Sequence, residues 1–141
     1  MVVDASVMIA ILTGEDGGEI HAGLIEDARR RVTSVMATWE ASVGLFRKTG
    51  LSMSEARAVV REFVEVAGID VLPVEPEDEA LALAIFETNG RHTVSDAERN
   101  RALNMADCFH YAVARRQGVP ILTTDAGFLS TGLVVLGLSA Q

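Results

Sequence analysis

The chain alternates short apolar runs with longer segments in which apolar residues recur every three or four positions. The short runs are rich in β-branched residues and predict strands at 2–3, 32–35, 69–74, 119–123 and 133–136. The longer segments predict helices at 5–13, 19–31, 36–48, 52–67, 77–88 and 103–117. Because each strand is a continuous apolar run, we predict a parallel sheet covered by helices on both faces.

This pattern assigns the chain to the α/β class, as a three-layer α/β/α sandwich with a central parallel sheet of about five strands. With 141 residues and a mass of 15.1 kDa, we expect one domain over residues 1–141. Residues 89–100 are polar and contain glycine, which predicts a loop. The three arginines at 29–31 are expected at the solvated end of the second helix, where the helix dipole favours cations.

Composition limits where the protein works. The hydrophobic fraction is 49%, yet no apolar run approaches the roughly 20 residues needed to cross a bilayer. The first apolar run contains Asp4 and has no basic leader, so we expect no secretory signal, no membrane association and a cytoplasmic location. The single cysteine, Cys108, cannot form an internal disulfide and is expected to be a small core residue.

The charge balance narrows the possible partners. A formal net charge of −8 argues against a broad basic surface for nucleic acid, since such binding depends on Lys and Arg. It does not exclude an enzyme that acts on nucleic acid. Acids that converge on one site repel each other, and a bound divalent cation relieves this repulsion and recruits phosphate. A basic partner protein would relieve it as well.

Four acids are predicted to meet at one edge of the sheet. Asp4 and Asp125 directly follow predicted strands, and ligands of open parallel sheets bind beyond the carboxyl ends of the strands. Asp107 lies early in the helix that precedes the fourth strand, and Glu40 lies in the second turn of the helix that follows the second strand. Carboxylates are the ligands that Mg²⁺ and Mn²⁺ prefer, so the sequence predicts such a metal site.

Polar neighbours fit that site. Ser6 and Thr123 offer hydroxyl groups two positions from Asp4 and Asp125, and Asn104 lies three positions before Asp107 on the same helix face. Other residues are candidates for nucleic-acid contacts: the loop before the Asp107 helix carries Arg91, Arg99 and Arg101.

Each acid also has a simpler interpretation. Asp4 alone would cap the first helix, Asp125 alone would begin a turn, and Glu40 alone would be a solvated helix residue. Two other residues are ambiguous in the same way. For His110, three positions after Asp107, a packed side chain is favoured over a metal ligand, and Trp39 is expected in the core or on a dimer surface.

Four segments resemble the PIN-domain family and, within it, the VapC-type toxins of bacterial toxin–antitoxin pairs. They are Val3-Asp4-Ala5-Ser6, Trp39-Glu40-Ala41, the stretch from Leu103 to Ala112, and the stretch from Pro120 to Phe128. The resemblance implies that Asp4, Glu40, Asp107 and Asp125 are catalytic, metal-binding acids, supported by Ser6 and Thr123. One position departs from the pattern, because Gly127 stands where relatives often carry a further acid or a histidine.

The same resemblance implies a function. It indicates a metal-dependent endoribonuclease in which Mg²⁺ or Mn²⁺ activates a water for attack on the phosphodiester. It further implies a homodimer and a cognate VapB-type antitoxin. The alternative is a catalytically weak PIN-fold binding module that acts through its antitoxin and DNA. A phosphoacceptor signalling domain fits less well, because the chain lacks paired acids near the first strand and a lysine after the last.

Overall fold

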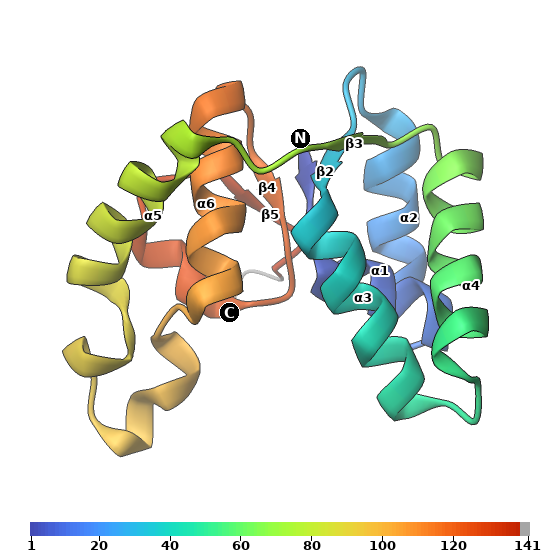
Figure 1. Cartoon of the computed structure of the whole chain (residues 1–141), viewed down its shortest axis with the longest axis horizontal. Helices are drawn as coiled ribbons and strands as arrows, with labels where there is room; N and C mark the ends of the chain where they lie inside the picture. The colour runs from blue at the N-terminus through green and yellow to red at the C-terminus, as the bar shows by residue number, and fades with distance from the viewer. Residues whose placement is uncertain (139–141) are drawn as a thin grey trace.

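Five short parallel strands form the centre of the molecule. The structure is a computed structural model that describes residues 1–138 (Figure 1). The strands are β1 (Val2–Val3), β2 (Val32–Ser34), β3 (Asp70–Leu72), β4 (Ile121–Leu122) and β5 (Val135–Leu136). They pair in the order β3-β2-β1-β4-β5, and every pairing is parallel. The predicted parallel sheet is therefore confirmed, and β1 and β4 are neighbours.

Six helices cover the sheet. They are α1 (Ala5–Thr13), α2 (Gly18–Asp27), α3 (Val35–Lys48), α4 (Met53–Val66), α5 (Pro76–Asn89) and α6 (Met105–Gln117). Figure 1 shows α5 and α6 on one side of the strands and α1 to α4 on the other. Neighbouring strand residues point to opposite faces, so Val3 packs with α1 to α4 and Val2 packs with α5 and α6. These two cores confirm the three-layer sandwich.

Local signals fix where the helices begin and end. Ser52 and Glu55 form a reciprocal capping box at the start of α4, as their spacing indicates. Gly14 and Gly118 end α1 and α6 with φ angles of 67° and 63°, which favour glycine.

A buried ion pair ties α5 to α6. Arg116 Nε donates to Asp78 Oδ1 at 2.7 Å, and its Nη2 donates to Asp78 Oδ2 at 3.0 Å. Asp78 is 0% exposed, and its Oδ2 also accepts from the backbone N–H of Glu75 at 2.8 Å, which closes the first turn of α5. The pair lies near the C-terminal end of α6, away from the end that carries Asp107.

Three sequence predictions about local structure need correction. The stretch 89–100 is not wholly irregular, since η1 (Arg91–Thr93) and η2 (Asp96–Arg101) are 3₁₀ helices. Such short turns show no apolar periodicity that a sequence pattern could reveal. The arginines at 29–31 do not end a helix, because α2 stops at Asp27. The backbone carbonyl of Arg31 instead accepts a hydrogen bond from the N–H of Asp70, next to the pairing of β2 with β3. The strands are also shorter than their apolar runs.

Two composition-based expectations can be compared with the structure. Within residues 1–138 no helix is long and apolar enough to cross a membrane. Cys108 is buried in the α5–α6 core, as expected.

Trp39 was expected in the core or on a dimer surface. It is not a core residue, because its exposed fraction is 67%.

Candidate active site

The carboxyl ends of β1 and β4 carry the centre of the candidate site. Asp4 follows β1 directly, and Asp125 begins η3 (Ala126–Ser130) just after β4. Glu40 comes from α3 and Asp107 from the first turn of α6. The charges of Asp4 and Asp125 help to raise the pKa of Asp107, and those of Asp4 and Glu40 help to raise the pKa of Asp125. The four carboxylates therefore influence one another electrostatically, but only those of Asp4 and Glu40 belong to the close group of possible metal-ligand atoms.

Asp4 is 2% exposed, and both of its carboxylate oxygens accept hydrogen bonds. Its Oδ1 accepts from the N–H of Ala5 at 2.7 Å, so it does cap α1. Its Oδ2 accepts from the hydroxyls of Ser6 and Thr123, both at 2.6 Å. The two hydroxyls in turn accept N–H groups of the segment after β4, from Thr124 and Asp125 respectively. These charge-assisted bonds offset the cost of burying Asp4 and fix its orientation.

Asn104 and Asp107 form a reciprocal capping box at the start of α6. Asp107 N–H donates to Asn104 Oδ1 at 3.0 Å, and Asn104 N–H donates to Asp107 Oδ2 at 2.8 Å. Asn104 therefore acts on the site through the orientation of Asp107. Burial is the main cause that raises the pKa of Asp107 from 3.8 to about 7, and the charges of Asp4 and Asp125 raise it further.

This raised pKa predicts how the metal-free protein responds to pH. The unfolded carboxyl ionises near 3.8 and the folded one near 7, so between these values the folded state binds more protons and stability falls as pH rises. With 1.36 kcal/mol per pKa unit, the loss attributable to Asp107 is at most about 4 kcal/mol. In EDTA, urea unfolding at pH 5 and pH 8 should show a larger loss for the wild type than for Asp107→Asn. Equal losses in both proteins would contradict the pKa assignment.

Asp125 is half-buried and serves as a turn residue as well. Its Oδ1 accepts from the N–H of Gly127 at 2.7 Å, and burial is the main cause that raises its pKa. A Cβ at Gly127 would lie 3.1 Å from Asp125 Oδ1, 3.2 Å from Leu103 Cδ2 and 3.3 Å from Arg101 O. A larger side chain there would require these neighbours to shift by a few tenths of an ångström, so glycine fits this turn without such a shift.

His110 joins the acids, which the sequence did not predict. Its Nε2 lies 3.2 Å from Glu40 Oε1 and 3.6 Å from Asp4 Oδ1, and its exposed fraction is 1%. Burial lowers the pKa of His110, yet the hydrogen bond to Glu40 and the charges of Asp4, Glu40 and Asp107 raise it overall. The only sequence signal was its position three residues after Asp107, which places both side chains on one face of α6.

The donor set fits a divalent cation. One ligand atom from each of Asp4, Glu40 and His110 lies within 4.8 Å of the others. Carboxylate oxygens and imidazole nitrogen are both common ligands of first-row divalent metals. The net effect of the acids on His110 is to favour a positive charge at this position, and the same field favours a bound cation.

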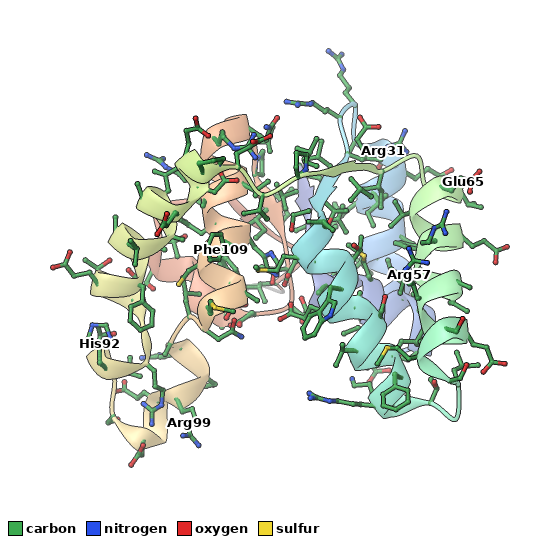
Figure 2. All side chains as sticks on the ribbon, in the orientation of Figure 1. Arg31, Arg57, Glu65, His92, Arg99 and Phe109 are labelled. Carbon is green, nitrogen blue, oxygen red and sulfur yellow. The ribbon has the colours of Figure 1, made fainter. Side chains whose placement is uncertain are left out.

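The three predicted nucleic-acid-binding arginines all belong to the segment between α5 and α6. Arg91 pairs with Asp96, and Arg101 pairs with Glu98 at 3.3 Å. Arg99 is exposed, and none of the described residues forms an ion pair with it. Figure 2 shows Arg99 at the outer end of this segment, away from the sheet.

The fold and the site define an α/β protein with a carboxylate-rich site at the switch point of a parallel sheet, between β1 and β4. A family model described as "PIN domain" matches residues 1–133. The chain belongs to the PIN domain family, in its VapC group.

A relative of known name supports that assignment, and two solved structures share the fold. Ribonuclease VapC28 of Mycobacterium tuberculosis is 32% identical over 133 residues, covering 94% of this chain and 95% of the relative. The crystal structure of M. tuberculosis VapC20, described as a sarcin-ricin loop cleaving toxin, superimposes with a TM-score of 0.71 at 21% identity, covering 94% and 95% of the two chains. A toxin–antitoxin complex from Klebsiella pneumoniae contains a chain with a TM-score of 0.68 at 13% identity, covering 99% and 98%.

Proposed function

We propose that this protein is a metal-dependent endoribonuclease and the toxin of a type II toxin–antitoxin system. The observation that supports the proposal is the close approach of ligand atoms from Asp4 and Glu40, with Asp107 and Asp125 near enough for the acid charges to raise their pKa values. The names of the relatives add the substrate: VapC28 is called a ribonuclease, and VapC20 is described as cleaving an RNA loop.

In the proposed mechanism these four acids hold Mg²⁺ or Mn²⁺. The bound ion would supply an activated water and would stabilise charge on the phosphoryl oxygens. The hydroxyls of Ser6 and Thr123 hold the carboxylate of Asp4 in place. Asp107 uses Oδ2 in its capping box, which leaves Oδ1 to orient the attacking water; Glu40 is the other candidate for that role.

Arginine side chains would position the RNA. We assign phosphate contacts to Arg91, Arg99 and Arg101, and Arg99 is the most available of them, because the other two hold ion pairs with Asp96 and Glu98. Phosphate contacts of this kind give affinity without sequence selection, so these residues would not choose which RNA is cut.

Protein partners belong to the same proposal. A VapB-type antitoxin, a homodimer and a cytoplasmic location fit the VapC relatives and the toxin–antitoxin complex from K. pneumoniae. The surface near the site is also apolar, since Val35, Trp39 and Met105 are 54%, 67% and 68% exposed. Exposed apolar patches of this kind commonly mark protein interfaces.

A cleavage assay tests the function. The full chain, freed of antitoxin, should cut RNA in Mg²⁺ or Mn²⁺ and lose this activity in excess EDTA, with recovery when metal is restored. Cleavage that persists in EDTA would overturn the metal-dependent mechanism. Metal binding without any RNA cleavage would favour the alternative, a PIN-fold module that acts through an antitoxin and DNA.

A further inference from the structure

His110 is a buried histidine whose contacts in the site are acids. Its Nε2 faces Glu40 Oε1 at 3.2 Å and Asp4 Oδ1 at 3.6 Å, while its Nδ1 is buried and has no hydrogen-bond partner among residues 1–138. The Nδ1 of His21 is likewise buried and without a partner among the described residues, so what distinguishes His110 is the approach of its Nε2 to two carboxylates. The position of His110 therefore needs a reason beyond packing.

The distances suit a shared ion. Two ligand atoms, each about 2.1 Å from one metal and separated by an angle of 90–120°, lie about 3.0–3.6 Å apart. The separations of His110 Nε2 from Glu40 Oε1 and from Asp4 Oδ1, 3.2 Å and 3.6 Å, fall in this range. The first of these distances is also that of a hydrogen bond, and the second is too long for one. A single ion between the three groups would account for both.

We propose that His110 is a nitrogen ligand of the metal site, so that one imidazole, close to Asp4 and Glu40, joins the acids that hold the ion. This inference rests on the proposed function, and it specifies which ion the site prefers. Mg²⁺ is a hard ion that is bound almost entirely through oxygen, so an imidazole ligand costs it more affinity than it costs Mn²⁺, the first member of the transition-metal series that imidazole binds with increasing strength. The chain should accordingly bind Mn²⁺ more tightly than Mg²⁺, by a margin that depends on His110.

Pulsed EPR of bound Mn²⁺ gives a readout independent of catalysis. The full wild-type chain with one equivalent of Mn²⁺ should show nitrogen coupling to the ion, and this coupling should change to the ¹⁵N pattern when the histidines are ¹⁵N-labelled. The chain has only three histidines, and His92 is exposed on η1. The measurement on labelled wild-type protein needs no substitution, so it does not depend on a variant that folds.

Two variants complete the test. Loss of an outer-shell partner typically lowers metal affinity about 10–100-fold, so loss of a ligand should lower it at least about tenfold. His110→Leu should lose the nitrogen coupling and weaken Mn²⁺ binding by at least that factor in calorimetry, with a smaller effect on Mg²⁺. His92→Leu should leave the nitrogen coupling and the affinities for Mn²⁺ and Mg²⁺ unchanged.

The outcomes separate this inference from the proposed function. Tight Mn²⁺ binding without histidine coupling, together with EDTA-sensitive RNA cleavage, would overturn the role of His110 and leave the ribonuclease intact. A wild-type protein that binds neither Mn²⁺ nor Mg²⁺ would overturn both. Coupling that survives in His110→Leu would assign the nitrogen to another histidine and would overturn the inference.

Discussion

Asp4→Asn should abolish RNA cleavage, with a fall in rate of at least about a thousandfold. A bound metal supplies several kcal/mol of transition-state stabilisation, and each 1.36 kcal/mol corresponds to a factor of about ten in rate. Asp4 is the most buried of the four acids, and its two oxygens are fixed by Ala5, Ser6 and Thr123. A neutral amide at this position removes one negative charge from the metal site and presents one poor ligand oxygen instead of two.

The substitution is designed to spare the fold. Asparagine is as good an N-cap as aspartate, so the bond from the N–H of Ala5 can persist and α1 should still begin at the same place. Asp16→Asn is the matched control, since Asp16 is exposed in the loop between α1 and α2 and its variant should retain full activity. RNA cleavage and Mn²⁺ binding should be measured on both, with urea unfolding to confirm the fold. A folded Asp4→Asn protein that cleaves RNA at the wild-type rate would refute the assignment of the site.

The convergence of the acids could be predicted because it depends on topology more than on detail. Continuous apolar strands imply a parallel sheet. In a parallel sheet the carboxyl ends of all strands lie at the same end of the sheet. The adjacency of β1 and β4 was the one further condition, and the structure meets it. The positions of Asp4 and Asp125 then follow from their places in the chain.

The side-chain partners could not be predicted in this way. Whether His110 meets Glu40 depends on how α6 is rotated about its axis and how closely it approaches α3, and both are set by packing between segments far apart in sequence. Asn104 was expected either to orient a carboxylate or to bond a metal-bound water or a phosphate; in the structure its side chain caps α6 and so helps to fix Asp107. Its spacing to Asp107 fits both roles equally, and only the structure separates them.

The simpler interpretations of the acids and the metal site are compatible. Asp4 caps α1, Asp107 completes the capping box of α6, and Asp125 caps η3. In each case backbone N–H groups at a helix start help to hold a carboxylate that is at least half-buried, which lowers the cost of gathering negative charge. The same hydrogen bonds orient the carboxylates. The capping role of an acid is therefore no evidence against its role in metal binding.

Arg116→Met should lower the free energy of unfolding more than any surface substitution in this chain. Removing one partner of a buried ion pair typically costs about 3–5 kcal/mol, because the other charge is left without compensation. Asp78 is 0% exposed, while the side chain of Arg116 is 25% exposed, so we expect the lower end of that range. Urea unfolding at pH 7 measures the effect, and Arg115→Met, at an exposed neighbouring position, should stay within about 0.5 kcal/mol of the wild type.

A double variant shows how much of the lost stability comes from the uncompensated charge of Asp78 and how much from the lost contacts of Arg116. Asp78→Asn removes the charge but keeps an oxygen for the N–H of Glu75, so Asp78→Asn with Arg116→Met should be more stable than Arg116→Met alone. If the double variant is less stable than the single one, the loss reflects packing of the arginine stem and not an uncompensated carboxylate. Because the pair lies at the opposite end of α6 from Asp107, the RNA cleavage rate per folded molecule should remain that of the wild type in all of these variants.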